Sequence, residues 1–584
     1  MRYNVLACDY DETLARAGQV DEKTIEALER LSRAGVKLLL VTGRELDDLL
    51  SVFPHPALFD LVVAENGGLL YDPHQRTCDL LATPAPPELA DRLRDEGVSP
   101  LGLGQVLIAT REPHDVQVLA AIRELGLELQ VIYNKGAVMV LPPGVNKATG
   151  LAAALDRLSL SAHSVVAVGD GENDHAFLRA AECGAAVANA LPALKDACDV
   201  RLDGENGHGV AELAGKLLAG DLDTLELPRH HVLLGHGDGD EEEVRLPTYG
   251  IGLLVAGPSG SGKSTVTTAL LERLSGDDYQ CVIVDPEGDY AEFPGLTILG
   301  DPDRVPAVDE VVNVLEQPSQ SVVINLIGLQ LRDRPAYFAE LLPRLTSLRA
   351  KLGHPHWLVI DEAHHLMPAE IRDIPIHQVG DLGAVLMITV HPDAMSSAAL
   401  RLVTSTIAVG KEPENTLSAF ATALDLPAPS LPPSRGEEDK GDLALWPAGA
   451  EHARRLRLVP ARAERTRHRR KYAAGTMAKD KSFYFTGPQE QLRLRARNLH
   501  TFVELAEGVD DDTWLHHLHR GDYSAWIRDQ LGDAELADEV AAVEGEQEND
   551  LSPQDSRQRV AGLIGERYTL PAEPTDFDPD HKDR

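Results

Sequence analysis

Two ordered sets of short polar motifs constrain what this chain of 584 residues can fold into, because each motif follows an apolar segment of strand length. The first set is CDYDETLA, VTGR, VNKATG and VAVGDGENDHAFL. The second set is AGPSGSGKST and HWLVIDEAHH. Polar residues at the carboxyl ends of strands that alternate with helices are typical of mostly parallel α/β sheets, which bind ligands at that edge. The sequence therefore predicts an α/β multidomain chain with two such sites.

Charge and cysteine content narrow the class of protein. A formal net charge of -38 repels polyanions, so contact with nucleic acid would need a local basic patch. The five cysteines form no CxxC pair, which favours a reducing compartment over a disulfide framework or a zinc cluster. The first residues read as a strand, and no apolar run reaches the roughly 18 residues of a membrane span. We expect a cytoplasmic protein with no membrane contact.

The first motif set has the residues for transferring a phosphoryl group. Asp9 and Asp11 follow the first strand two positions apart, so one carboxylate can attack phosphorus while the other protonates the leaving oxygen and later activates water. Thr42 offers a hydroxyl to the phosphoryl oxygens, and Lys147 supplies a positive charge at a helix start. The residues predicted to hold or orient a Mg²⁺ ion are Asp9, Asp11, Asp170, Asn173 and Asp174.

The second motif set has the form strand, GxxxxGK[ST] loop, helix, which predicts an ATP site. The glycines let backbone N–H groups wrap the phosphates, Lys263 reaches the β and γ oxygens, and Ser264 binds Mg²⁺. Asp361 at a strand end is expected to hold the same Mg²⁺, and Glu362 to polarise an attacking water. The predicted nucleotide-binding residues are Gly257, Gly260, Gly262, Lys263, Ser264 and Thr265.

The first motif set, with ENGG at 65–68 and GAAVANALPALKDACDV downstream, resembles the Cof-type branch of the haloacid dehalogenase superfamily. That resemblance implies a Rossmann-like core, an aspartyl-phosphate intermediate and an inserted α/β cap, here about residues 83–143. A cap this small favours a small phosphorylated metabolite as substrate. The family usually has glycine after the second aspartate, where this chain has Glu12. An extra carboxylate there is expected to alter leaving-group preference or slow the reaction.

The second region resembles the HerA/FtsK-like ATPases, through CVIVDPEGDY after the P-loop helix and AVLMITVHPDAM after the acid pair Asp361 and Glu362. That resemblance implies a homo-oligomeric ring, plausibly a hexamer, with an arginine from the neighbouring subunit at each ATP site. Arg344, Arg349 and Arg401 are the candidates. Thr389 and His391 occupy the place where such enzymes often carry a glutamine that senses the γ-phosphate.

The remainder of the chain carries no motif with readable chemistry. Nine basic side chains concentrate around 454–471, where we favour a solvated face over a nucleic-acid contact. Trp514 and Trp526 are expected in the core of a small helical bundle. The predicted domains are a phosphatase at 1–220, a P-loop ATPase at 229–460, a helical domain at 464–543 and an acidic, largely disordered tail with one short helix at 544–584.

Three functions fit these observations. The leading one is a Mg²⁺-dependent phosphatase for a small metabolite fused to an ATPase. The second is a nucleic-acid translocase with an accessory phosphatase, which the overall negative charge disfavours. The third is a regulatory ATPase switch that binds protein partners and whose phosphatase is vestigial. The complete set of Asp9, Asp11, Lys147 and Asp170 disfavours the third.

Overall fold

A computed structural model describes residues 2–568 of the chain, except 238–241, 291–292, 371–373, 434–441, 462–481, 490, 532 and 547–551. The chain divides into two compact units, Met1–Val459 and Pro460–Arg584, which are described separately. The first unit contains an eight-stranded sheet and an eleven-stranded sheet, each with its own hydrophobic core, and a smaller four-stranded sheet. In the part of the chain that the structure describes, no helix is both long and apolar enough to cross a bilayer.

The first sheet has eight strands in the order β12-β11-β10-β1-β2-β3-β4-β5. Its strands are β1 Val5–Cys8, β2 Lys37–Val41, β3 Leu61–Ala64, β4 Leu69–Asp72, β5 Thr77–Leu80, β10 Val165–Gly169, β11 Cys183–Ala186 and β12 Val200–Arg201. All but β4 and β5 pair in parallel. Because helices cover both faces of a parallel sheet, its central strands are continuously apolar, and β1 and β10 are fully buried.

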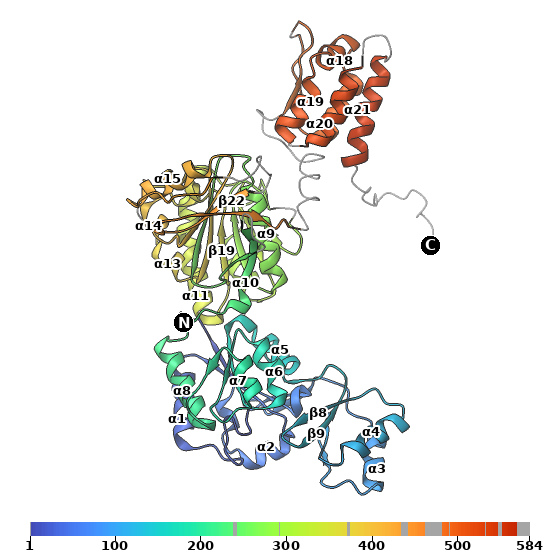
Figure 1. Ribbon diagram of the computed structural model, residues 1–584, viewed down its shortest axis with the longest axis vertical. Helices are drawn as coiled ribbons and strands as arrows, with labels where there is room; N and C mark the ends of the chain where they lie inside the picture. Colours follow the sequence, from blue (N-terminus) through green and yellow to red (C-terminus); the bar gives the residue numbers. More distant parts are fainter. Residues whose placement is uncertain are drawn as a thin grey trace. The chain divides into compact units, whose positions relative to one another are not determined.

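Helices connect these strands and flank the sheet (Figure 1). They are α1 Glu22–Arg33, α2 Leu46–Val52, α5 Lys147–Leu158, α6 His175–Ala180, α7 Pro192–Ala197 and α8 Asn206–Ala219. Asn146 caps α5 by accepting from the backbone N–H groups of Ala148 and Thr149, which fixes the start of the helix at Lys147. The order of the strands brings the carboxyl ends of β10, β1 and β2 side by side.

A small α/β cap is inserted between β5 and α5. Its antiparallel sheet has the order β6-β7-β9-β8. The cap elements are α3 Pro87–Asp95, β6 Gly102–Leu103, β7 Ile108–Arg111, α4 Asp115–Glu124, β8 Gln130–Asn134 and β9 Ala137–Leu141. Leu89, Leu93, Val118 and Val140 are among the residues of a core of its own.

The second sheet has eleven strands in the order β14-β13-β23-β22-β21-β15-β20-β19-β16-β18-β17. Its strands are β13 Val232–Gly237, β14 Glu243–Leu246, β15 Ile251–Ala256, β16 Cys281–Asp285, β17 Thr297–Leu299, β18 Val322–Asn325, β19 Trp357–Ile360, β20 Ala384–Thr389, β21 Ser405–Val409, β22 Asp442–Pro447 and β23 Arg454–Leu458. The strands from β21 to β17 pair in parallel, and those from β14 to β22 extend the sheet with antiparallel pairs.

Helices lie on both faces of this sheet, with α9 and α15 on opposite sides (Figure 1). The helices are α9 Lys263–Gly276, α10 Val308–Leu315, α11 Arg334–Leu352, α12 Ala363–Leu366, α13 His377–Gly380, α14 Ser397–Leu400 and α15 Pro413–Ala423. Of the predicted basic stretch, the strand Arg454–Leu458 is described, whereas Arg467, Arg469 and Arg470 lie outside the described residues.

In its described residues the second unit is mainly helical, with one hairpin of β24 Phe483–Phe485 and β25 Leu494–Ala496. Its helices are α17 Leu499–Gly508, α18 Asp511–Leu518, α19 Asp522–Trp526, a π-helix Ile527–Leu531, α20 Ala534–Glu544 and α21 Pro553–Tyr568. Trp514 and Trp526 are buried in its aromatic core, as predicted. Helix α21 falls in the segment predicted as a tail, and its Val560 and Ile564 pack into the same core. The domain limits themselves stay predictions.

Candidate active sites

A buried lysine joins two aspartates at the edge of the first sheet. Asp9 directly follows β1, and Lys147 begins α5. The Lys147 ammonium donates to Asp9 Oδ1 at 2.5 Å and to Asp174 Oδ1 at 2.6 Å. The other oxygen of Asp174 accepts from the backbone N–H groups of Asp170 and Gly171, both at 2.8 Å. The lysine is thereby held beside the carboxylate predicted to attack phosphorus.

Burial and charge oppose each other at these groups. Burial alone lowers the pKa of Lys147, but the carboxylates of Asp174 and Asp9 raise it above its usual value. Burial raises the pKa of Asp9, and Lys147 works against that shift while Asp174 adds to it. The site therefore carries more carboxylates than its lysine neutralises, which favours binding of a further cation.

The oxygen atoms that face one another fit a magnesium ion. Carboxylate oxygens of Asp9, Asp170 and Asp174 lie within 4.8 Å of one another. Asn173 donates its side-chain N–H to Asn66 Oδ1 at 3.0 Å, while its own buried Oδ1 has no hydrogen-bond partner among the described residues. Hard oxygen donors of this kind suit Mg²⁺. The structure brings together four predicted residues here, Asp9, Lys147, Asp170 and Asp174.

Asp11, the predicted acid and base, has a partner that the sequence reading missed. Arg44 donates from Nε to Asp11 Oδ2 at 2.8 Å and from Nη2 to Asp11 Oδ1 at 2.6 Å. Thr42 is fully buried after β2, and its hydroxyl accepts from the Arg44 backbone N–H at 3.1 Å. The VTGR motif thus supplies both the predicted hydroxyl and the arginine that orients Asp11.

Glu12 adopts a left-handed backbone conformation, with φ of 58°. Glycine takes this conformation without steric cost, whereas other residues lose about 1–2 kcal/mol. The Glu12 side chain accepts from the backbone N–H of Ala17 at 3.1 Å, so its carboxylate is engaged with the loop after β1. The backbone conformation therefore accounts for the family's usual glycine, and the Glu12 carboxylate makes no contact with the predicted phosphate site among the described residues.

The ENGG segment connects the core to the cap. The buried Glu65 carboxylate accepts from the backbone N–H groups of Gln105, Val106 and Leu107 at 2.8, 2.7 and 3.1 Å. A Cβ atom on Gly67 would lie 2.0 Å from the Asn146 carbonyl oxygen, so glycine lets this turn meet the start of α5. The same segment therefore places the cap loop and the helix that carries Lys147.

A lysine side chain of the cap also reaches the aspartates. Lys135 lies in the turn between β8 and β9, and its ammonium contacts Asp170 Oδ2. Its backbone N–H donates to Glu172 at 3.2 Å. Thr13 donates to the other oxygen of Asp170 at 3.1 Å. Sequence reading missed Lys135, because a lysine in a surface turn has no motif to distinguish it.

The GPSGSGKS loop joins β15 to α9 as predicted for a nucleotide site. Gly260 and Gly262 have φ of 75° and 103°, and a Cβ on Gly257 would lie 2.1 Å from the Val409 carbonyl oxygen. The Lys263 ammonium donates to the carbonyl oxygens of Gly257 and Pro258 at 3.0 and 2.9 Å. Ser264 is exposed and Thr265 half-buried in the first turn of α9.

The predicted acids lie at the carboxyl ends of strands in the same parallel sheet. Asp361 and Glu362 follow β19, which β20 separates from the P-loop strand β15. Burial, with Asp285 and Asp289 nearby, raises the pKa of Asp361 well above its usual range. Burial and Glu287 raise the pKa of Glu362. Asp285, which the sequence reading left without a role, accepts from four backbone N–H groups of the loop 287–290.

Polar groups beside Glu362 come from β20 and α12. His364 Nδ1 lies 3.4 Å from Glu362 Oε2 and 3.1 Å from the hydroxyl of Thr389. The Thr389 hydroxyl also accepts from the His391 backbone N–H at 3.0 Å. Burial lowers the pKa of His364 to about 4, so the ring is neutral at pH 7. Both residues considered for the γ-phosphate sensor thus lie near the predicted catalytic glutamate.

Comparison with known proteins identifies families for both parts of the first unit. The family described as haloacid dehalogenase-like hydrolase matches residues 6–96 and 101–213. The family described as Helicase HerA, central domain, matches residues 252–351. Both resemblances expected from the motifs are confirmed.

Relatives of known name align with the first part of the chain. A phosphoglycolate phosphatase of Methanothermobacter thermautotrophicus is 29% identical over 222 residues, which cover 36% of this chain and 98% of that protein. The phosphoglycolate phosphatase of Methanopyrus kandleri is 30% identical over 225 residues, 37% of this chain and 97% of that protein. A solved haloacid dehalogenase-like hydrolase from Bacteroides thetaiotaomicron is 20% identical, with a TM-score of 0.33, and covers 37% of this chain and 99% of that one.

Proposed function

The chain belongs, through residues 6–213, to the haloacid dehalogenase-like hydrolases, and from this premise we propose that it is a Mg²⁺-dependent phosphatase fused to an ATP-hydrolysing P-loop domain. The buried group of Asp9, Lys147 and Asp174 carries the proposal, because it places a carboxylate beside a fixed positive charge. The named relatives act on phosphoglycolate. A small phosphorylated carboxylate of that kind is therefore the proposed substrate.

The residues suggest how the phosphatase reaction would proceed. An Asp9 oxygen attacks phosphorus, the bond from phosphorus to the leaving oxygen breaks, and Asp11 gives that oxygen its proton. A water then attacks the aspartyl-phosphate, Asp11 takes its proton, and phosphate leaves. Lys147 offsets the repulsion between the carboxylate and the anionic phosphate throughout. A Mg²⁺ ion held by Asp9, Asp170 and Asp174 would supply further positive charge.

The P-loop domain is proposed to hydrolyse ATP. The loop N–H groups and Lys263 would hold the phosphates, and Ser264 and Asp361 would hold Mg²⁺. Glu362 would orient and deprotonate the attacking water, since its raised pKa makes it a better base than an exposed glutamate. The match to the HerA central domain supports this assignment.

The two activities are tested by separate variants of the full chain. We expect Asp9→Asn to lower phosphoglycolate hydrolysis by roughly 10³-fold or more while ATP hydrolysis stays near its original rate. Lys263→Ala should abolish ATP hydrolysis, and Glu362→Gln should still bind ATP but cleave it slowly. Asp95→Asn, at an exposed cap position, is the control. Normal ATP hydrolysis by either P-loop variant, or normal phosphatase turnover by Asp9→Asn, contradicts the assignment.

The second candidate function is nucleic-acid translocation, which the HerA match favours. The net charge of -38 argues against it. We expect the ATPase rate to stay unchanged when DNA or RNA is added at low salt. A stimulated rate that glutamine substitutions at Arg467, Arg469 and Arg470 abolish would make translocation the primary function.

A further inference from the structure

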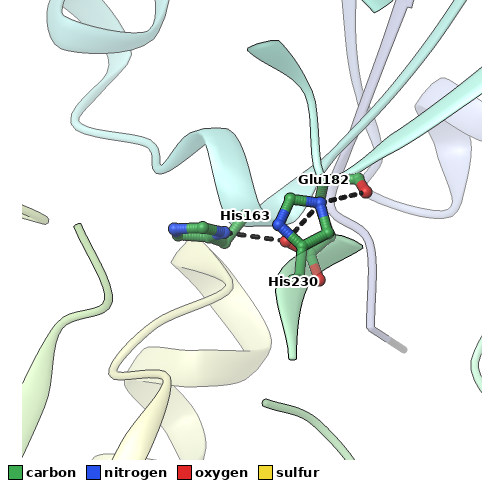
Figure 2. A group of neighbouring side chains, drawn as sticks. All are labelled: His163, Glu182 and His230. Carbon is green, nitrogen blue, oxygen red and sulfur yellow. Dashed lines mark hydrogen bonds and ion pairs between the residues drawn. The ribbon is translucent and has the colours of Figure 1, made fainter. Parts of the chain in front are cut away.

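Two histidines from distant segments meet at one carboxylate, away from both predicted phosphate sites. His163 lies in a short helix Ala162–Ser164, Glu182 directly precedes β11, and His230 ends a short helix Pro228–His230. Figure 2 shows both imidazole rings against the Glu182 carboxylate. His163 Nδ1 is 2.7 Å and His230 Nε2 is 3.6 Å from Glu182 Oε2. One ligand atom from each residue lies within 4.8 Å of the other two.

We propose that these three residues form a zinc site. Two imidazole nitrogens and one carboxylate oxygen are a common ligand set for Zn²⁺, whereas Mg²⁺ prefers oxygen ligands alone. Zinc bonds of about 2.0–2.2 Å require ligand atoms separated by about 3–3.5 Å, so the present spacing needs only small side-chain adjustments. The ion would take the place of the proton between His163 Nδ1 and Glu182 Oε2.

The atoms around the cluster hold the ligands in the orientation that a metal needs. His163 Nε2 lies 2.8 Å from the Asp277 carbonyl oxygen and donates to it, which leaves Nδ1 directed at the ion. Histidines that bind metals usually donate their second N–H in this way. Arg2 donates to Glu182 Oε1 at 2.8 Å and so fixes the carboxylate with Oε2 facing the histidines.

Packing limits how far the ligands can move. The ring of Tyr279 stacks on His163 with centroids 3.6 Å apart, and its hydroxyl lies 3.3 Å from Glu182 Oε2. Glu182 is 3% exposed, whereas the side chains of His163 and His230 keep 11% and 16% of their surface. An ion could therefore enter past the two rings. The Tyr279 phenol or a water would complete the coordination.

His230 must exchange one hydrogen bond to bind the ion. Its Nε2 now lies 2.9 Å from the Glu182 backbone oxygen, to which it donates. Coordination through Nε2 moves the remaining ring proton to Nδ1. This exchange costs one hydrogen bond of about 1 kcal/mol, which a metal bond from a positioned imidazole outweighs.

The site would tie together parts of the first unit that are remote in sequence. Glu182 directly precedes β11 of the first sheet, and His230 stands just before β13 of the second sheet. Asp277 and Tyr279 follow α9, the helix that the P-loop begins. A bound ion would thus cross-link the phosphatase core to the start of the ATPase sheet, and its expected role is structural.

Zinc binding by the full chain tests the proposal. The protein is stripped with a chelator, equilibrated with excess Mg²⁺ to occupy sites of oxygen ligands, and dialysed against Zn²⁺. Elemental analysis should then find one more zinc per chain in the wild type than in the variant with His163→Gln and His230→Gln. His231→Gln, at the neighbouring histidine outside the cluster, should retain this zinc, as should His364→Gln. The melting temperature of the wild type should rise with zinc, and that of the double variant should not.

Cobalt provides a readout that does not depend on the variants folding. Co²⁺ bound by the wild type should give the strong visible absorption of a four- or five-coordinate ion with imidazole ligands, and zinc should displace it. Equal zinc contents in wild type and a folded double variant would overturn the proposal, as would a cobalt spectrum of hydrated ions alone. The cluster would then be a hydrogen-bonded contact. None of these outcomes depends on the proposed phosphatase or ATPase reactions.

Discussion

A single lysine of the cap, Lys135, is in a position to select the substrate. It extends from the turn between β8 and β9 to Asp170, where a magnesium ion would compete with it for the carboxylate. A substrate carboxylate beside the phosphate would offer the displaced ammonium a new partner. The proposed preference for a small phosphorylated carboxylate thus has a candidate recognition residue.

Lys135→Gln is expected to raise KM for phosphoglycolate about tenfold, because a charge-assisted hydrogen bond is worth about 1.5–3 kcal/mol. Hydrolysis of p-nitrophenyl phosphate, which has no carboxylate, should change much less. Steady-state kinetics on both substrates measures the difference, with the exposed Lys23→Gln as control. Equal losses on both substrates would place Lys135 with the phosphate or metal instead.

His356 makes stability depend on pH. Its Nδ1 accepts from the Gln280 backbone N–H at 2.8 Å, so the buried ring is neutral, and burial lowers its pKa well below the usual value. The unfolded chain takes up the proton below about pH 6.5, whereas the folded chain does not. Stability from this residue is therefore present above pH 6.5 and is lost as the pH falls.

Between pH 7.5 and pH 5.5 we expect the wild type to lose about 1 kcal/mol more stability than His356→Gln. Denaturant titrations at the two pH values measure the loss for each protein. The comparison of slopes remains valid even if the variant is less stable at every pH. Parallel losses in the two proteins would show that His356 is protonated in the folded chain.

The predictable residues were those whose chemistry requires a fixed place after a strand. Asp9, Asp170 and Asp174 were found because they follow two apolar runs, which form the neighbouring parallel strands β1 and β10. The contact of Arg44 with Asp11 could not be predicted, because it depends on how two loops pack. The pairing of His163 with His230 has no sequence signal, since 67 positions separate two otherwise ordinary histidines.

At the scale of elements, the contact between Glu65 and the loop 105–107 attaches the cap to the core. The Glu65 carboxylate accepts hydrogen bonds from three backbone N–H groups. A glutamine side chain would keep only one acceptor oxygen and would place an NH₂ group against those N–H donors. The turn that carries Glu65 also contacts α5 through Gly67. Loss of this contact should free the cap loop before it affects the core.

Glu65→Gln is therefore expected to destabilise the cap attachment by about 1–3 kcal/mol. Hydrogen exchange of the amides at 105–107 should quicken, and KM for the substrate should rise more than kcat falls. The exposed cap residue Glu88 provides the matched control, Glu88→Gln. Unchanged exchange at those amides would show that the carboxylate does not hold the loop.

Elements with local signals were predicted, whereas pairings across long separations were not. The strands that precede the motifs, β1, β10, β15 and β19, follow from apolar runs of strand length. The antiparallel pairing of β13 with β23 joins segments more than 200 residues apart, so nothing in either segment indicates the partner. The eleven-stranded sheet emerges only from that pairing.

At the scale of the whole molecule, the resemblance to the HerA/FtsK-like ATPases leads us to predict that copies of the chain assemble. Light scattering with a non-hydrolysable ATP analogue should show an oligomer, with a hexamer as the expected size. Arg344→Ala or Arg401→Ala should then slow ATP hydrolysis while the oligomer stays assembled. A strictly monomeric chain with full ATPase activity would contradict the shared-site proposal.

Arg349, the third candidate, cannot be the arginine that completes the ATP site of a neighbouring subunit. Arg349 is buried, donates to the Pro355 carbonyl oxygen and lies over the ring of Tyr249 with its guanidinium carbon 5.7 Å from the centroid. An arginine used inside its own subunit cannot reach the site of another. Arg344, paired with Asp309 at the surface, and the exposed Arg401 stay as candidates.

If substitutions accumulate at random, the backbone at position 12 should favour replacement by residues that tolerate a left-handed conformation. Because φ at this position is 58°, replacing Glu12 by glycine should remove backbone strain, whereas valine or isoleucine should add to it. In a library of all replacements selected for folding, glycine and asparagine should therefore become enriched at this position. A glutamate that persists there under selection would have to be retained for what its carboxylate does.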